Sequence, residues 1–226
     1  MLLRVPKVLS RDELAQCRDR LATATWGDGK VTAGHQSAKV KDNLQLAQDS
    51  AEARDLGALV VGALERSPLF ISAALPKHVF PPLFNKYESD MSFGMHVDNA
   101  IRPIPGTPRR LRTDVSATLF ISAPEDYDGG ELIVEDTYGT HSVKLAAGDM
   151  ILYPATSLHR VAPVTRGARI ASFFWIESLV KDDGERTLLF NLDRAIAQLG
   201  QAKADEAALV QLTALYHNLV RKWGET

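Results

Sequence analysis

Three side chains in the middle of the chain have the types and spacing that bind a transition-metal ion. His96 and Asp98 lie two residues apart in a run typical of a strand. Alternate side chains of a strand share one face, with Cα atoms roughly 6.5–7 Å apart, so the imidazole and the carboxylate can converge on one ion. His159 follows a proline-containing turn and is the best candidate for a third ligand. Two imidazoles and one carboxylate on one side of an ion leave the opposite positions open, as in non-haem Fe(II) oxygenases.

An arginine further along the chain strengthens this hypothesis, because a His-x-Asp motif alone occurs by chance in many proteins. Arg169 follows His159 by ten residues and precedes an apolar run at 170–176. An arginine in such a strand needs an anion to offset its desolvation, and its planar guanidinium suits a carboxylate. On its own, Arg169 would pair with a structural Asp or Glu. Beside the three metal ligands, it predicts a binding site for an acid.

The strands that would position these residues begin at about Leu83. Short β-branched and aromatic runs, separated by Gly, Pro, Asp and Asn, predict strands at 83–87, 92–98, 113–122, 131–135, 141–145, 150–153, 160–164 and 168–176. Regularly spaced short strands favour a sandwich or barrel over alternating β-α units. The sequences Asp128-Gly129-Gly130 and Ala147-Gly148-Asp149 supply turn positions that accept a positive φ. A mainly β core is therefore expected.

Helices are predicted on both sides of this β region. A capping box at 10–13 begins a helix that runs to about Ala24, and apolar spacing predicts a second helix at 51–65. The segment 26–40 between them is interpreted as loop or weak strand. Two more helices are predicted through 188–199 and 209–219, with Gly200 as a stop. We expect an N-terminal helical and loop segment (1–80), a β core (81–178) and a C-terminal helical extension (179–226).

Composition limits the function classes. The chain has 226 residues, of which 45% are hydrophobic and 24% charged, which suits one domain of a soluble globular protein. A net charge of −2 gives no basis for binding nucleic acid or a membrane surface. The single cysteine, Cys17, cannot form an internal disulfide and is expected to pack in the core. With no secretory signal and no long apolar window, we expect a cytoplasmic protein.

The candidate site and its surroundings resemble the PKHD-type hydroxylases, bacterial relatives of the prolyl 4-hydroxylase catalytic domain. Matching stretches include MSFGMHVDNAIR (91–102), TDVSATLF (113–120), EDYDGGEL (125–132) and LHRV (158–161), and the match covers nearly the whole chain. The resemblance implies a distorted double-stranded β-helix (jelly-roll) core with flanking helices. It implies Fe(II), 2-oxoglutarate and O₂, with L-ascorbate keeping the iron reduced. Some members of this family are associated with iron uptake, which identifies no substrate.

The resemblance also implies residue roles. By position, His96, Asp98 and His159 become the iron ligands and Arg169 holds the far carboxylate of 2-oxoglutarate, with no catalytic residue beyond the metal centre.

Two aromatic residues are further candidates for binding the co-substrate. In the wider prolyl hydroxylase group, a tyrosine nine or ten residues before the first histidine often supports 2-oxoglutarate, and Tyr87 lies nine residues before His96. Trp175 is a second candidate, as a residue that lines the pocket. The alternative for both is an ordinary place in the core.

The activity implied is a dioxygenase that decarboxylates 2-oxoglutarate to succinate and CO₂ while a C–H bond of a second substrate is hydroxylated. A zinc hydrolase would not need Arg169 beside the metal, and no Glu is clearly placed as its general base. A purely structural β-barrel would leave the same arginine unexplained. A non-catalytic sensor of 2-oxoglutarate or iron would keep all four residues, and only turnover separates it from an enzyme.

Two features leave alternatives open. The apolar C-terminal helices offer more buried-type surface than a small β core needs, which is compatible with a homo-oligomer. The Pro/Gly-rich stretch 99–112 contains four arginines and is interpreted as a long loop. That loop is either a lid that favours anionic ligands at the substrate entrance, or a basic segment that is solvated or lies at a subunit interface.

Overall fold

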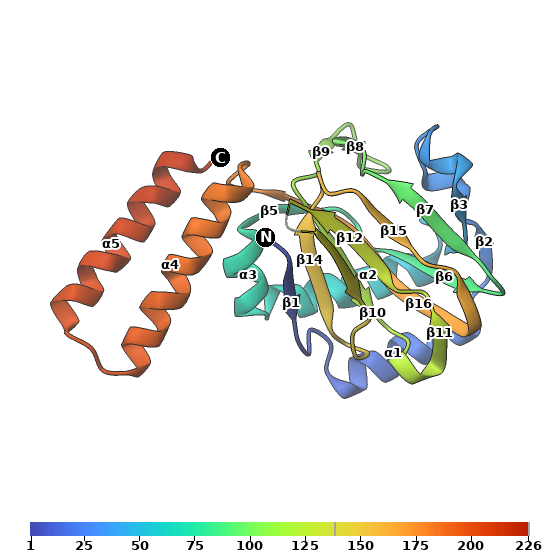
Figure 1. Ribbon diagram of the computed structural model, residues 1–226, viewed down its shortest axis with the longest axis horizontal. Coiled ribbons are helices and arrows are strands. Elements are labelled where there is room, and N and C mark those ends of the chain that lie inside the picture. Colours follow the sequence, from blue (N-terminus) through green and yellow to red (C-terminus); the bar gives the residue numbers. More distant parts are fainter. Residues whose placement is uncertain (138, 226) are drawn as a thin grey trace.

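In a computed structural model, which describes residues 1–137 and 139–225, two antiparallel β-sheets face each other and helices cover the outer side of the larger one (Figure 1). The strands of the larger sheet are β1 (Leu3–Val5), β2 (Trp26–Asp28), β4 (Leu44–Leu46), β5 (Pro76–Val79), β6 (Leu83–Glu88), β10 (Val115–Phe120), β11 (Tyr127–Gly129), β14 (Met150–Pro154) and β16 (Val164–Ser178). Their order is β1-β14-β10-β16-β6-β4-β2, and β5 and β11 also pair with β16.

The smaller sheet has the order β13-β12-β15-β7-β3. Its strands are β3 (Lys41–Asp42), β7 (Ser92–His96), β12 (Leu132–Asp136), β13 (Gly139–Val143) and β15 (His159–Val161). Side chains of both sheets pack together in one buried cluster, which includes Tyr87, Phe120 and Tyr153 from the larger sheet and Leu132 and Val161 from the smaller. The sheets therefore form the two walls of a double-stranded β-helix, as the sequence predicts.

Each strand segment predicted from the sequence contains a strand, with shifts at the ends. β7 ends at His96, so Asp98 lies two residues beyond the strand and not within it. The predicted strand 160–164 is divided, because β15 ends at Val161 and β16 begins at Val164. The short strands β1 to β5 were not predicted as strands, apart from the weak-strand alternative at 26–40. Segments of two to four residues carry no readable alternation and become strands only by pairing with their neighbours.

The helices follow local sequence signals. They are α1 (Arg11–Ala22), α2 (Ala51–Glu65), α3 (Pro68–Ala74), α4 (Asp183–Gln201) and α5 (Glu206–Trp223), with 3-10 turns at Gly29–Thr32, Ser37–Lys39 and Pro124–Asp126. The predicted capping box is present: the Glu13 amide donates to Ser10 Oγ at 3.2 Å, and the Ser10 amide donates to the Glu13 carboxylate at 2.9 Å. Gly200 is not a stop, because α4 continues through it. The short helix α3 was not predicted.

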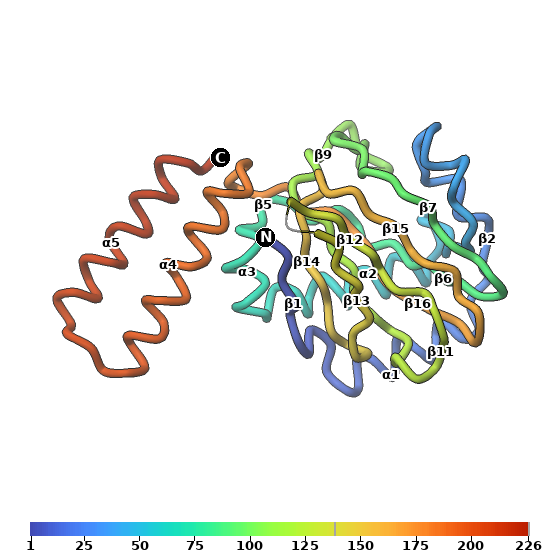
Figure 2. Tube along the Cα trace, in the orientation of Figure 1, coloured from blue at the N-terminus to red at the C-terminus, as the bar shows by residue number. Residues whose placement is uncertain are grey.

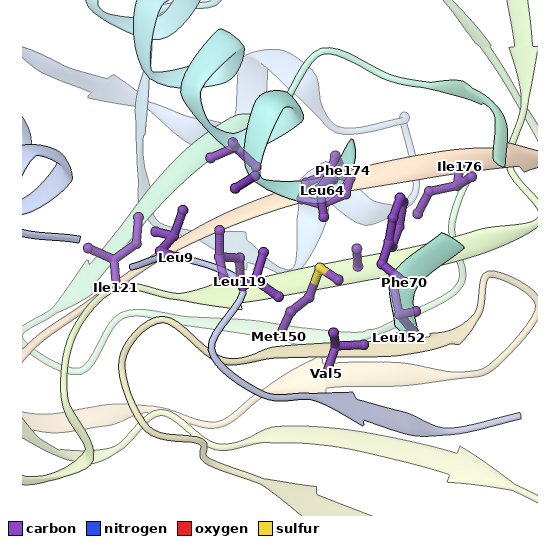
Figure 3. Packing of buried hydrophobic residues seen from close by; sticks show 14 of the residues in the cluster. Val5, Leu9, Leu64, Phe70, Leu119, Ile121, Met150, Leu152, Phe174 and Ile176 are labelled. Atoms are coloured by element: carbon purple, nitrogen blue, oxygen red, sulfur yellow. The ribbon is translucent and has the colours of Figure 1, made fainter. Parts of the chain in front are cut away.

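The long strand β16 separates the hydrophobic core from the interior between the sheets. Its even-numbered side chains Ile170, Phe174 and Ile176 pack against the helices, in the same cluster as Leu56 and Leu64 of α2. Figure 3 shows Phe174 next to Leu64, and Ile176 beside Phe70, in this core. Because strand side chains alternate, the odd-numbered residues of β16 face the other sheet. The helices thus fix the position of a strand whose opposite face lines the candidate site.

The C-terminal helices form a hairpin that projects from the β core (Figures 1 and 2). Its base packs in a small cluster in which Leu189 of α4 and Trp223 of α5 meet Leu75 from the end of α3. Glu225 also accepts a hydrogen bond from Arg112 Nη1 at 2.7 Å. Residues before 81 add strands to both sheets as well as helices. The division into segments 1–80, 81–178 and 179–226 stays a prediction.

The expectation of a loop at 99–112 is wrong. This segment folds back on itself as a two-stranded hairpin of β8 (Ile101–Pro103) and β9 (Arg110–Arg112). The Ile104 amide donates to the Arg109 carbonyl at 2.9 Å and closes the turn. Pairing gives strand structure to a sequence that shows no alternation of its own.

Among the described residues, no single helix is long and apolar enough to cross a membrane. Only α2 and α3 taken together pass such a test, and they are bent by 87° at their junction.

Candidate active site

The pocket between the two sheets contains all the candidate site residues. His96, Asp98 and His159 offer ligand atoms that lie within 4.8 Å of one another. The pairing of β15 with β7 places His159 directly opposite His96, and their ring centroids are 4.2 Å apart. His159 Nε2 lies 3.8 Å from Asp98 Oδ2. The tertiary structure therefore brings together three residues that the sequence only suggested as partners.

Hydrogen bonds fix which ring nitrogen of each histidine is free. His96 Nδ1 lies 2.8 Å from the Gly94 carbonyl oxygen, and His159 Nδ1 lies 3.0 Å from the Ser157 carbonyl oxygen. A carbonyl oxygen only accepts, so Nδ1 of each ring donates, and Nε2 is the nitrogen left to ligate a metal. Burial, followed by repulsion from His159, lowers the pKa of His96 to about 4. That imidazole is therefore neutral at pH 7, the form that ligates metals.

The carboxylate ligand is also oriented. Ser116 Oγ on β10 donates a hydrogen bond of 2.5 Å to Asp98 Oδ2. Such partners behind a ligand hold it in place and adjust its basicity. This set of two imidazoles and one carboxylate fits Fe(II).

Arg169 is buried, and no carboxylate among residues 1–137 and 139–225 forms an ion pair with it. Its exposed fraction is 1%, and its Nε and Nη1 have no hydrogen-bond partner among the described residues. The guanidinium carbon lies 5.4 Å from the ring centre of Tyr87 and 5.3 Å from that of Phe120. Arg186, which is 2% exposed, shows the contrast, because its donors bond two carbonyl oxygens and Asp183. Unused donors on a buried cation indicate a place for an anionic ligand.

The two aromatic candidates lie at different ends of the pocket. Tyr87 is the cross-strand partner of Arg169, and burial raises the pKa of its phenol to about 12. Trp175 lies on the same face of β16, six residues beyond Arg169, which corresponds to roughly 20 Å along a strand. The Trp175 ring packs against the Arg102 guanidinium at 3.9 Å. Tyr87 is therefore beside Arg169, whereas Trp175 is not.

Sequence reasoning missed four residues around this pocket. Ser116 was readable as an inward position of an alternating strand, but nothing marked it as the partner of Asp98. The buried hydroxyl of Tyr127 has no hydrogen-bond partner among the described residues, and its ring lies close to Gly130 near Arg169. Burial raises the pKa of this phenol as well. Lys41 and Arg102 line the pocket from β3 and β8, elements that were not predicted.

The remaining histidines play no part in this cluster, as the sequence predicts. His141 bonds Asp136 at 2.8 Å, and His78 contacts Arg109 Nη2 at 2.6 Å. Within residues 1–137 and 139–225, the group whose spacing fits a metal ion consists of His96, Asp98 and His159.

Comparison with known proteins identifies the class. The family model of the 2OG-Fe(II) oxygenase superfamily matches residues 82–177, and that of the PKHD-type hydroxylase C-terminal domain matches residues 183–225. A prolyl-4-hydroxylase from Pseudomonas putida has a similar fold, with a TM-score of 0.52 at 19% identity, over 78% of this chain and 92% of that one. A prolyl hydroxylase from Trichoplax adhaerens has a TM-score of 0.56 at 13% identity, over 83% and 86%. The fold and the family match define a 2-oxoglutarate-dependent Fe(II) dioxygenase.

The relatives in sequence identify the family within that class. A PKHD-type hydroxylase of Saccharophagus degradans is 57% identical over 226 residues, which is 100% of both chains. One from Beijerinckia indica is 59% identical over 225 residues, again covering 100% of both. The chain belongs to the PKHD-type hydroxylase family. The family implies Fe(II) and 2-oxoglutarate, and the buried His-Asp-His set and the unpaired Arg169 fit both.

Proposed function

We propose that the pocket is the active site of a hydroxylase in which His96, Asp98 and His159 hold Fe(II). Arg169, supported by Tyr87, then binds the far carboxylate of 2-oxoglutarate. The observation that supports this most directly is the buried guanidinium with free donors in the same pocket as the three ligands. A planar guanidinium binds a carboxylate through two parallel hydrogen bonds, which fixes the orientation of the acid as well as its affinity.

The protein's own residues carry out binding, orientation and exclusion of water. When bound, Fe(II) and 2-oxoglutarate supply the oxidative decarboxylation that is coupled to hydroxylation of the substrate. Ser116 and the two backbone carbonyls hold the ligands so that each presents a lone pair to the ion. Apolar side chains from both sheets, such as Ile151 of the larger sheet and Val161 of the smaller, exclude water from the interior. Preorganisation of this kind avoids rearrangement of the site during the reaction.

Several finer expectations remain proposals. L-Ascorbate would keep the iron reduced, and a role in iron uptake would set the biological context. A cytoplasmic location is supported by the single buried thiol of Cys17. A homo-oligomer is supported by apolar side chains exposed on the projecting helices, among them Leu188 and Leu199 of α4 and Val210 of α5.

The experiment that tests the active-site assignment is anaerobic reconstitution with Fe(II) and 2-oxoglutarate. We expect the weak visible charge-transfer band of a chelated keto acid in the wild type, and its loss in His159→Ala and His96→Ala. His141→Ala is the matched control, because His141 is an exposed histidine bonded to Asp136. Full iron affinity in both ligand variants would refute the assignment. Admission of O₂ and assay of succinate then separates an enzyme from a non-catalytic sensor.

A further inference from the structure

We propose that Lys41 and Arg102 form a second anion-binding site in the pocket, and that it holds a carboxylate of the substrate to be hydroxylated. This inference rests on the proposed function and specifies its substrate class, an organic acid. Both residues line the same pocket as the three metal ligands and Arg169.

Lys41 is a buried cation with uncharged partners. Its exposed fraction is 4%. Its Nζ donates to Thr32 Oγ1 at 3.0 Å and to Gln45 Oε1 at 3.2 Å, and it lies over the rings of Phe93 and Phe173 at 5.4 and 5.7 Å. Neutral oxygens and aromatic faces stabilise an ammonium group but do not neutralise it. A buried lysine without a carboxylate partner therefore needs an anion from elsewhere.

Arg102 approaches the same place from the hairpin. Its guanidinium packs on the Trp175 ring at 3.9 Å, and its Nη2 donates to the Thr32 carbonyl oxygen at 3.1 Å. Its buried Nε has no hydrogen-bond partner among the described residues. Arg102 and Lys41 thus both contact Thr32, one through its backbone and one through its side chain. Stacking on Trp175 fixes the plane of the guanidinium and leaves a donor free for a ligand.

The two cations act on each other. Burial, and next the repulsion from Arg102, lowers the pKa of Lys41 to about 8, so the ammonium form still prevails at pH 7. The carboxylates that act on Lys41 are those of Asp28 and Asp98. Asp28 is exposed at the surface, and Asp98 is one of the three candidate metal ligands. Like charges held together in a partly buried site are costly unless an anion joins them.

The sum of charges in a pocket that holds Fe(II) and 2-oxoglutarate also favours an anionic substrate. Fe(II) and the 2-oxoglutarate dianion cancel, and so do Asp98 and Arg169. The charges of Lys41 and Arg102 then remain without a counterpart in the pocket. Because unpaired charge inside a protein is disfavoured, the remaining ligand should bring negative charge.

The position of this pair suits an anchor for the substrate. Trp175, on which Arg102 packs, is the cross-strand partner of Ser116, and Ser116 bonds the metal ligand Asp98. Arg102 therefore lies at the Trp175 end of the pocket, six residues of β16 beyond Arg169, and Lys41 lies over Phe173, between those two ends. An acid held there would present its carbon chain to the metal while 2-oxoglutarate occupies the deeper end.

The test is calorimetric binding of small acids to protein loaded with Zn(II) in place of Fe(II) and saturated with 2-oxoglutarate. Acetate, butyrate and benzoate are the probes, and each is compared with its neutral amide. We expect at least one acid to bind about tenfold more tightly than its amide. Lys41→Met and Arg102→Gln should each remove about tenfold of this affinity. Arg110→Gln, an exposed arginine in the same hairpin, is the matched control and should change the affinity less than about twofold.

Equal affinities for acids and amides, or acid affinities unchanged in both variants, would overturn the inference. Loss of 2-oxoglutarate affinity in Arg102→Gln would also overturn it, because the pair would then belong to the co-substrate. Arg102→Gln changes a half-buried side chain, so it tests the site even if Lys41→Met fails to fold. Failure of the proposed function would be seen separately, in the charge-transfer band measured without any probe acid.

Discussion

Replacement of Arg169 by methionine tests the co-substrate assignment most directly. Arg169→Met removes the guanidinium and keeps an unbranched side chain of similar length. Truncation of one partner of a buried, hydrogen-bonded charge pair costs about 2–5 kcal/mol. At about 1.4 kcal/mol per factor of ten, the dissociation constant of 2-oxoglutarate should rise roughly 30-fold to several thousandfold. Iron affinity should change far less, because Arg169 is not one of the three residues that offer a ligand atom.

A second prediction concerns the stability of the Arg169→Met variant in the absence of ligands. Methionine removes the desolvation cost of a buried cation that has no counter-ion. It also removes two cation–π contacts, with Tyr87 and Phe120, each contributing about 0.5–2 kcal/mol. These effects oppose each other, so the free energy of unfolding of the ligand-free protein should change by less than about 2 kcal/mol. A purely structural arginine would instead lose a partner and destabilise the fold strongly.

The assay is anaerobic calorimetry with 2-oxoglutarate, together with thermal unfolding with and without the co-substrate. Arg166→Met is the matched control, because Arg166 precedes Arg169 on the same strand but is exposed and bonds Asp128. The control should bind 2-oxoglutarate like the wild type. Wild-type co-substrate affinity in Arg169→Met, with the loss appearing in Arg166→Met, would refute the assignment.

Two further predictions concern side chains outside the ion's ligand set. Ser116→Ala should lower metal affinity about 10- to 100-fold, because the hydrogen bond that orients Asp98 is lost. Competition with a chelating dye measures this, and an unchanged affinity would show that Asp98 is oriented by other means. Burial raises the pKa of Cys17 to about 11, so at pH 8 the native thiol is protonated as well as enclosed. Iodoacetamide should modify it only after unfolding, and rapid modification of the folded protein would contradict the burial.

Local signals in the sequence determined much of the fold. The capping box of Ser10 and Glu13 marks the start of α1 in the sequence, because both hydrogen-bond partners lie within one helical turn. The nearly continuous apolar run at 170–176 predicted a buried strand, which is part of β16. An arginine in such a strand was recognisable as an anomaly. His96 and Asp98 were recognisable by residue type and spacing, although β7 ends at His96 and Asp98 lies beyond the strand.

Tertiary structure decided what depends on contacts between distant segments. The pairing of β15 with β7 sets His159 opposite His96, and no local pattern specifies that register. The hairpin β8–β9 resembled a loop because proline and glycine obscure any alternation, yet its pairing directs Arg102 into the pocket. Lys41 lines the pocket from the two-residue strand β3, which is defined only by its pairing with β7. Short-range sequence signals encode helices, strand faces and ligand types, whereas the assembly of a pocket from separate strands depends on the closure of the whole sheet.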